Sequence, residues 1–291
     1  MDIMQKALYY EKIYKDVFLH LNKPNVDIFL CGGASTSKKK SFRDTLRKKL
    51  EIIEKINILY PEDLFMELLN RKKYNLLELE DILAENSDYI VIVSESPGSY
   101  AELGAFANNE NIRKKTIVLS HTKYKNSRSF ITQGPIQHIK KYNKNNVIYY
   151  NDNNIEDCIE QVLKCINISY RNGICYNYNN SKKDIDLISG QYYYILLLLY
   201  FFDELSDIQS IIKGVFLKQK FNPTNYDPII IATIKRLFRE GLICQKQTEN
   251  GKSKYILSDK GYQATCSLLD SIDFENKCNT LNRIRLDIMN A

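Results

Sequence analysis

The chain has 291 residues, of which 44% are hydrophobic and 26% are charged, a balance that excludes disordered and fibrous proteins. This length suffices for two domains with separate cores. The formal net charge of +6 is mild, and a solvated surface explains it better than a nucleic-acid interface does. Composition therefore predicts an ordinary two-domain protein and leaves its function to local patterns.

Several further classes of protein are excluded by simple patterns. Charges recur throughout the first twenty residues without the apolar run of a secretory signal, which predicts a cytoplasmic protein. The most apolar stretch, residues 192–202, is shorter than the roughly 20 residues that cross a bilayer, so we expect a buried helix and no membrane contact. The seven scattered cysteines contain no C-x-x-C pair, and the three histidines show no ligand spacing. We therefore expect reduced thiols and no metal site.

The first half of the chain alternates between helical and strand patterns. A leading amphipathic helix is predicted over residues 3–21, within an N-terminal segment 1–24. Strands are then predicted at 27–31, 56–60, 89–93, 116–120 and 147–150, and helices at 41–56, 64–85 (broken near 72–75), 99–109, 134–142 and 155–169. The strands are apolar throughout, which is typical of a parallel sheet covered on both faces. The sequence predicts an α/β domain over 25–170 with a doubly wound five-stranded parallel sheet.

The second half predicts a smaller domain over 187–291, after a polar linker at 171–186. Helices are predicted at 191–202, 205–220, 228–240 and 259–269, with strands at 241–245 and 254–258 around an Asn250-Gly251 turn. This order predicts a C-terminal winged helix-turn-helix domain. In a DNA complex its basic residues would face phosphates: Lys235, Arg236 and Arg239 on the third helix, and Lys252 and Lys254 on the wing. Docking of a protein is the alternative, because the third helix offers few base-reading groups.

Small and acidic residues follow the first three predicted strands, where doubly wound sheets bind ligands. They are Gly32, Gly33, Glu62, Asp63, Glu95, Ser96, Gly98 and Ser99. Each has a plainer explanation, since glycine pairs make turns and acidic residues cap helices. In particular, Ser99 and Glu102 fit a capping box, and local spacing alone favours that role for Glu102 over catalysis.

Longer segments carry a resemblance to known families. Asp88-Tyr-Ile-Val-Ile-Val, followed by Ser-Pro-Gly-Ser-Tyr-Ala-Glu102-Leu-Gly, resembles the signature of nucleoside 2-deoxyribosyltransferases. Residues 29–33, 60–65, 95–99, 102–111 and 128–131 resemble the ribosyltransferase/DNA-binding effectors encoded beside bacterial retron reverse transcriptases. The resemblance implies that Glu102 is the nucleophile and Asp88 a site-organising acid, and it adds Cys31 and Tyr60 to the candidate substrate-binding residues.

The same resemblance implies an antiphage toxin that its reverse transcriptase and multicopy single-stranded DNA (msDNA) hold in check, and self-association of the chain. N-glycosidic cleavage passes through an oxocarbenium-like state that a carboxylate stabilises or captures. The second acid of deoxyribosyltransferases has no clear counterpart near Glu95 or Ser96, and nicotinamide, which leaves a cationic linkage, needs no acid. We therefore expect NAD as the substrate and no separate cofactor. A nucleobase-exchanging deoxyribosyltransferase and a non-catalytic DNA-binding regulator are the alternatives.

Overall fold

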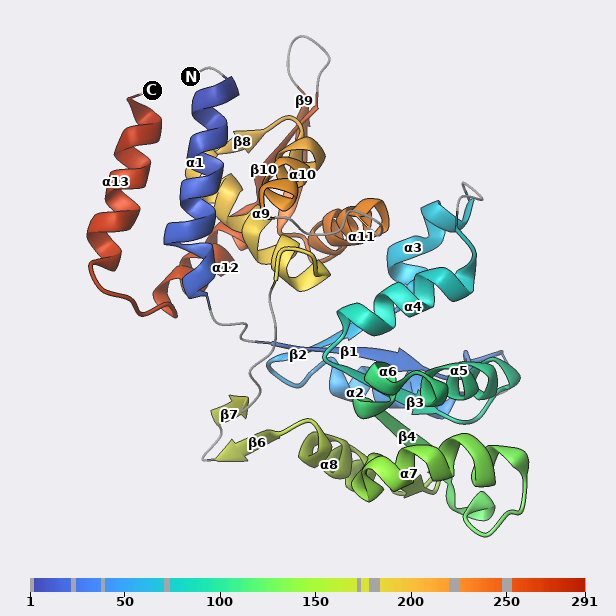
Figure 1. Ribbon diagram of the computed structural model, residues 1–291. Helices are drawn as coiled ribbons and strands as arrows, with labels where there is room; N and C mark the ends of the chain where they lie inside the picture. Colours follow the sequence, from blue (N-terminus) through green and yellow to red (C-terminus); the bar gives the residue numbers. More distant parts are fainter. Residues whose placement is uncertain are drawn as a thin grey trace. The chain divides into compact units, whose positions relative to one another are not determined.

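The computed structural model describes residues 3–21, 25–37, 40–70, 74–171, 174–177, 184–219, 226–247 and 253–290. The chain divides into two compact units. The first, here called the α/β unit, comprises Pro24–Met66 and Lys72–Ser181. The second, the helical unit, comprises Met1–Lys23, Glu67–Arg71 and Lys182–Ala291 (Figure 1). The helical unit is thus assembled from the two ends of the chain and from one short segment that interrupts the α/β unit in the sequence.

The α/β unit is built on a five-stranded sheet with the order β2-β1-β3-β4-β5, and all neighbouring strands are parallel. This confirms the parallel sheet that the apolar strands predict. Every residue of β1 is buried, as expected for an inner strand of a covered sheet. The strands are β1 (Val26–Cys31), β2 (Ile56–Leu59), β3 (Tyr89–Val93), β4 (Thr116–His121) and β5 (Val147–Tyr150).

Helices cover both faces of this sheet. Helices α2 (Phe42–Leu50) and α8 (Ile155–Cys165) share an apolar cluster with one face, which includes Ile28 and Leu30. Phe29 alternates to the opposite face, where its ring lies 5.9 Å from that of Phe106. The other helices are α3 (Pro61–Asn70), α4 (Leu76–Asn86), α5 (Pro97–Asn108), α6 (Glu110–Lys114) and α7 (Gln137–Tyr142). The strand order reverses direction between β1 and β3, which is the position where doubly wound sheets bind ligands.

Two helix boundaries in this unit test the sequence patterns. The predicted break near residues 72–75 is confirmed, because α3 ends at Asn70 and Asn75 caps α4 in a capping box with Glu78. The predicted helix 155–169 is too long. Asn167 adopts a left-handed conformation with φ of 51°, which ends the helix, and residues placed partly in a linker form an antiparallel hairpin. Its strands are β6 (Ile168–Arg171) and β7 (Ile174–Asn177).

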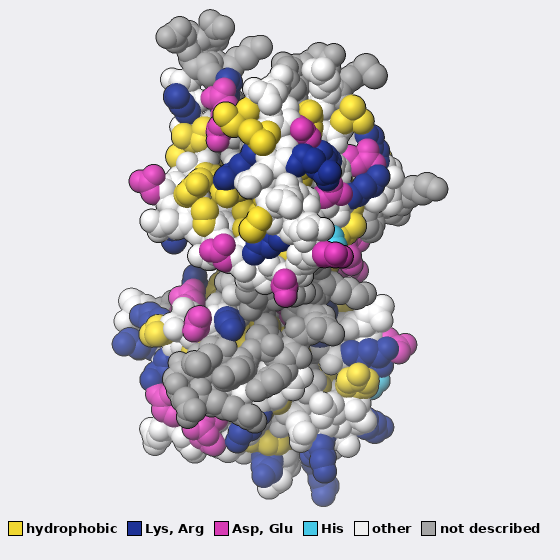
Figure 2. Space-filling model, turned by 90° about the vertical axis from the view of Figure 1, so that its left-hand side faces the viewer, with side chains coloured by type: hydrophobic (Ala, Val, Ile, Leu, Met, Phe, Trp, Pro, Cys, Tyr) yellow, Lys and Arg dark blue, Asp and Glu magenta, His cyan; other side chains and the backbone are white. Residues whose placement is uncertain are grey.

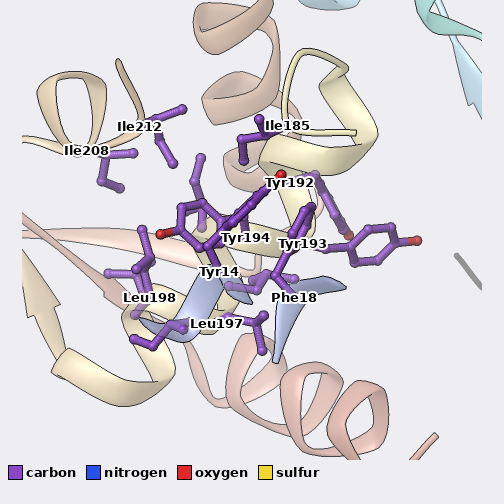
Figure 3. Close-up of a cluster of buried hydrophobic side chains, with 14 of the residues drawn as sticks. Tyr14, Phe18, Ile185, Tyr192, Tyr193, Tyr194, Leu197, Leu198, Ile208 and Ile212 are labelled. Atoms are coloured by element: carbon purple, nitrogen blue, oxygen red, sulfur yellow. The ribbon is translucent and has the colours of Figure 1, made fainter. Parts of the chain in front are cut away.

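The helical unit is organised around α9 (Ile188–Phe202), whose side chains are buried almost throughout. This confirms the buried helix predicted for the most apolar stretch. Figure 3 shows three consecutive tyrosines of α9 beside Tyr14 and Phe18 from the start of the chain. The Tyr194 hydroxyl donates to the Tyr10 carbonyl at 2.6 Å, so α1 (Ile3–Asp16) packs within this unit. Within the described ranges, no helix has the length and apolarity to cross a membrane.

The rest of the helical unit combines helices with a small sheet in the order β8-β10-β9. Its elements are β8 (Glu204–Leu205), α10 (Ile208–Lys218), α11 (Tyr226–Arg239), β9 (Ile243–Gln247), β10 (Ser253–Leu257), α12 (Asp259–Asp270) and α13 (Lys277–Met289). Strands β9 and β10 pair antiparallel as predicted, and their turn lies outside the described residues. The predicted helix at 205 begins only at Ile208, because Leu205 pairs with Tyr255 in the sheet. Helix α13 is absent from the sequence prediction.

Gly261 allows α12 to lie against the chain after α11. A Cβ atom at Gly261 would lie 1.9 Å from the carbonyl oxygen of Leu242, a backbone atom that cannot rotate away. Gly261→Ala is therefore expected to lower the free energy of unfolding by about 3 kcal/mol. Gly214 in α10 is the matched control, because its Cβ position has no atom within 4 Å among the described residues, apart from its chain neighbours and the nearby backbone of its own helix. Gly214→Ala should stabilise the helix by up to about 1 kcal/mol. Chemical denaturation measures both, and equal effects would contradict this packing.

Candidate active site at the switch point

The loop after β1 packs tightly against its two neighbouring loops. Gly32 has φ of +156°, and a Cβ there would lie 2.8 Å from the Cβ of Arg43. Arg43 also donates from its guanidinium to the Gly32 carbonyl at 3.2 Å. A Cβ at Gly33 would lie 3.3 Å from side-chain carbons of Glu95 and Ser96. The glycine pair therefore brings the predicted residues after β1 and β3 together at the switch point.

Glu95 anchors the N-terminus of α2. Its carboxylate accepts from the backbone N–H groups of Phe42 at 2.9 Å and Arg43 at 3.0 Å. Both oxygens are thus occupied by backbone N–H groups at the start of a helix. Glu95 therefore holds the site together, and this arrangement does not suit it to be the missing second acid.

Ser96, rather than Ser99, caps the helix that carries Glu102. The Ser96 hydroxyl accepts from the Ser99 N–H at 3.2 Å, and the Ser99 hydroxyl accepts from the Ser96 N–H at 3.0 Å. These two serines form the capping box, with Pro97 in the first turn. The prediction that Glu102 pairs with Ser99 in such a box is wrong. Ser99 is also 1% exposed, so its predicted contact with a substrate is wrong as well. Gly98 is exposed in the same turn.

Glu102 lies one turn further into α5 and is half-buried. One of its carboxylate oxygens is buried without a hydrogen-bond partner among the described residues. Burial raises the pKa of Glu102, while the Cys31 thiol and the Arg43 charge oppose the rise. Burial also raises the pKa of Cys31 well above its usual range, so this thiol stays protonated and donates to the carboxylate. A desolvated carboxylate with a free oxygen has the properties of a nucleophile.

Glu80 of α4 is a site residue that sequence reasoning missed. Burial raises the pKa of Glu80 to about 7, with further contributions from the charges of Glu102, Glu62 and Asp81. Glu62 lies in the first turn of α3 and is exposed. Glu62 also raises the pKa of Glu102. Glu62, Glu80 and Glu102, here called the carboxylate cluster, therefore come from three helices and interact through their charges.

The pKa of Glu80 makes the stability of the protein depend on pH. Its value rises from 4.5 to about 7 on folding, so its stabilising contribution is present below pH 4.5 and is lost as the pH rises through 7. Screening at this partly exposed side chain reduces the effect to about 1 kcal/mol. Glu80→Gln should therefore stabilise the protein by that amount at pH 8 and leave it unchanged at pH 4. Urea denaturation at both values tests this, and equal shifts at both would contradict it.

Tyr60 and Asp63, two more of the predicted site residues, contact arginines of α2. The Tyr60 ring lies 5.2 Å from the Arg43 guanidinium and 4.1 Å from that of Arg47. Tyr60 is 2% exposed, and its hydroxyl has no hydrogen-bond partner in the described part of the chain. Asp63 pairs with Arg47 at 3.3 Å. These contacts place both residues beside the switch point, where they position the arginines.

Asp88 lies away from this site. It precedes β3, whereas Glu102 follows the carboxyl end of that strand. A five-residue strand is roughly 16 Å long, so the two carboxylates are at opposite edges of the sheet. The Asp88 carboxylate instead accepts from the Asp27 backbone N–H at 2.7 Å and helps to join β1 to β3. The predicted role of Asp88 as a site-organising acid is therefore wrong.

The basic residues predicted to contact phosphates have different environments. Arg236 is 2% exposed, pairs with Glu240 at 2.9 Å, and places its guanidinium 4.6 Å from the Tyr192 ring. Its predicted phosphate contact is therefore wrong. Arg239 is exposed, Lys235 is partly exposed, and Lys254 pairs with Glu204. Lys252 lies outside the described residues.

Arg236 and Arg239 should differ sharply when each is replaced by alanine. Arg236→Ala removes a buried ion pair and the packing on Tyr192, so we expect a loss of about 3 kcal/mol in unfolding free energy. Arg239→Ala changes an exposed side chain and should stay within about 0.5 kcal/mol of wild type. Denaturation curves of the two variants test the difference. Equal stabilities would show that Arg236 is not structural.

No group of histidine, cysteine and acidic residues with the arrangement of a metal site occurs among the described residues. What the fold and the site define is a doubly wound α/β protein with a carboxylate cluster at the switch point of its sheet. The chain belongs to the family described as STM3845 retron effector protein, whose model matches residues 39–246.

Two relatives from Escherichia coli support this membership. The chain is 34% identical to "Retron Ec86 putative ribosyltransferase/DNA-binding protein" over 278 residues, which cover 91% of this chain and 84% of that protein. It is 36% identical to "Retron Ec73 putative ribosyltransferase/DNA-binding protein" over 117 residues, or 38% of this chain and 37% of that protein. The family resemblance predicted from the sequence is therefore confirmed.

Proposed function

We propose that this retron effector is an N-glycosidase that cleaves the nicotinamide–ribose bond of NAD. The carboxylate cluster carries this proposal, because one oxygen of Glu102 is buried without a hydrogen-bond partner in the described part of the chain, beside the charges of Glu62 and Glu80. Opposite charges attract more strongly in a partly buried site than in water. The cluster therefore favours the positively charged nicotinamide ring of NAD over a neutral nucleobase.

The reaction proceeds in two steps with Glu102 as the nucleophile. A Glu102 oxygen attacks C1′ of the ribose, and the electron pair of the N-glycosidic bond moves to the nicotinamide nitrogen, which becomes neutral. Water then attacks C1′, and the bond to Glu102 breaks with its electron pair returning to the carboxylate. Glu80 accepts the proton that this water loses, since a base with a pKa near 7 acts efficiently at neutral pH.

Glu80 also bears on the choice between NAD and a nucleoside as the substrate. No second acid is evident in the sequence near Glu95 or Ser96, but Glu80 can supply one in its protonated form. A deoxyribosyltransferase, in which Glu80 protonates a leaving nucleobase, is therefore the second candidate. Preference for NAD now rests on the charge of the carboxylate cluster instead.

The effector acts as an antiphage toxin in the cytoplasm, and the retron reverse transcriptase with its msDNA restrains it. The order α9, β8, α10, α11, β9 and β10 is that of a winged helix, which supports a nucleic-acid-binding role for the helical unit. Exposed Leu8, Leu286 and Met289 on α1 and α13 support self-association or a protein partner. Figure 2 faces this side and shows hydrophobic side chains among the charged ones of the helical unit.

One assay separates the candidate functions. The purified full-length protein, alone and with the co-expressed reverse transcriptase and msDNA, is incubated with NAD or with pairs of deoxynucleosides and free bases. Nicotinamide release supports the proposed N-glycosidase. Base exchange without nicotinamide release would identify a deoxyribosyltransferase, and a folded protein that forms neither product in either state would favour a regulator.

A further inference from the structure

A cavity of about 320 Å³ opens at the same edge of the sheet, between the start of α2 and the ends of three strands. Ser94, His121 and Tyr150 line it, and they lie at the carboxyl ends of β3, β4 and β5. This volume is at the lower end of the range for small-molecule sites. None of the proposed reaction steps uses these residues.

The lining combines flat rings with positive charges. The ring of Tyr150 stacks on that of Phe42 with centroids 3.8 Å apart, and the His121 ring meets Tyr150 edge-on at 5.4 Å. Lys40 and Lys123 are exposed at the cavity, and the Lys123 ammonium lies 4.9 Å from the Tyr124 ring. Phe42 and Tyr150 are both buried, so the more accessible rings of the lining are those of Tyr100, His121 and Tyr124. Aromatic rings suit a nucleobase, and lysines suit a phosphate.

The cavity lining also contains two carboxylates, Glu95 and Asp152, but they do not cancel the positive charge of the lysines. Glu95 uses both of its oxygens on the N–H groups of Phe42 and Arg43. Asp152 is 78% exposed at its side chain and lies 3.8 Å from the His121 ring nitrogen. A phosphate at the lysines would therefore meet no uncompensated buried anion among the described residues.

The turn between β3 and α5 connects this cavity to the carboxylate cluster. Glu95 lines the cavity and also packs beside Gly33, which is two residues from Cys31 and its contact with Glu102. Tyr100 lines the cavity from α5, the same helix that carries Glu102. The cavity and the carboxylate cluster are therefore built on the same turn and the same helix.

We propose that the cavity binds the adenosine monophosphate half of NAD while the nicotinamide end lies at the carboxylate cluster. This inference rests on the proposed function and adds the basis of its substrate selectivity. The adenine lies against the aromatic lining, and Lys40 and Lys123 hold the adjoining phosphate. The enzyme would then favour NAD over nicotinamide riboside, which lacks the whole adenosine diphosphate portion.

Steady-state kinetics on the full-length protein test this with the double variant Lys40→Ala/Lys123→Ala. We expect kcat/KM for NAD to fall about a hundredfold, roughly tenfold for each lost charged contact. Cleavage of nicotinamide riboside should stay unchanged, because that substrate does not reach the cavity. The control Lys140→Ala/Lys144→Ala removes the same charge from exposed lysines elsewhere in the unit and should retain wild-type kinetics. Equal losses on both substrates, or no loss on NAD, would overturn the inference.

Calorimetry with adenosine monophosphate gives a readout that does not require catalysis. The wild type should bind this probe, and the Lys40→Ala/Lys123→Ala variant should lose that binding. Binding by both proteins, binding by neither, or displacement of the probe by a single-stranded oligonucleotide would each count against the inference. A wild type that releases nicotinamide from neither substrate would refute the proposed function. Calorimetry would then still show whether the cavity binds adenosine monophosphate.

Discussion

Replacing Glu102 with glutamine is expected to lower nicotinamide release from NAD by about three orders of magnitude or more. Glutamine keeps the shape of the side chain but lacks the negative charge that attacks C1′ and stabilises the oxocarbenium-like state. Because the carboxylate is half-buried and one of its oxygens has no hydrogen-bond partner among the residues that the structure describes, its removal should not destabilise the fold. Liquid chromatography of free nicotinamide measures the rate, and thermal unfolding verifies that the variant is folded.

Glu110→Gln is the matched control for this experiment. Glu110 begins the next helix, is exposed, and pairs with Lys114 at the surface, so its loss should leave activity unchanged. Activity in Glu102→Gln close to that of the wild type would show that another residue is the nucleophile. Equal losses in both variants would indicate a general effect of charge.

Glu80→Gln is expected to separate the two steps of the reaction. Attack by Glu102 needs no base, so nicotinamide should appear in a burst of about one equivalent per site. Hydrolysis of the glycosyl-enzyme should then slow by about two to three orders of magnitude, because no base accepts the proton of water. Intact mass spectrometry should detect ADP-ribose attached to the protein. Azide, which attacks without losing a proton, should restore turnover.

The pH dependence gives a second readout for Glu80. A base must be deprotonated to act, so wild-type turnover should rise with pH up to about 7 and then level off. In Glu80→Gln this rise should disappear. Glu85→Gln, on an exposed turn of the same helix, is the control and should keep the wild-type profile. Unchanged steady-state turnover in Glu80→Gln, without a burst, would remove Glu80 from the mechanism.

The sheet could be predicted because its strands are buried on both faces. A run such as Ile90-Val91-Ile92-Val93 has no polar position, which marks a covered parallel strand even without knowledge of its neighbours. The hairpin β6–β7 was missed because the apolar pattern of α8 continues through Ile166 and Ile168. Only the left-handed backbone at Asn167 ends the helix there, and sequence spacing does not reveal it.

The candidate site could be predicted only for the residues that lie in one continuous segment of the sequence. Ser96, Ser99 and Glu102 offer two overlapping capping boxes, and local spacing does not decide between them. Pro97 favours the start at Ser96, because proline suits the first turn of a helix. With the helix starting at Ser96, Glu102 lies beyond the capping box and has no capping role. The two other members of the carboxylate cluster come from separate helices, and Glu80 stands among several acidic residues of α4 without any distinguishing pattern.

The buried position of Arg236 could have been found from the sequence. It lies three, four and seven residues after Thr233, Ala232 and Ile229, so all four share one face of the helix. That face is apolar and forms part of the core. Basic residues on such a face more often pair internally than reach a phosphate, and the reading of the helix as a row of positive charges overlooked this periodicity.

The contact between α1 and α13 also governs the order in which the units can fold during synthesis. Lys12 pairs with Asp287 across a sequence separation of 275 residues. At roughly 5–20 residues per second, a ribosome needs about 14 to 55 s to make the intervening chain. The side of α1 that packs in the helical unit therefore lacks α9 during the first part of that interval and lacks α13 until its end. The α/β unit, with Glu102 in place, is synthesised within the same interval, so the unit that carries the candidate site can mature while the helical unit is still being made.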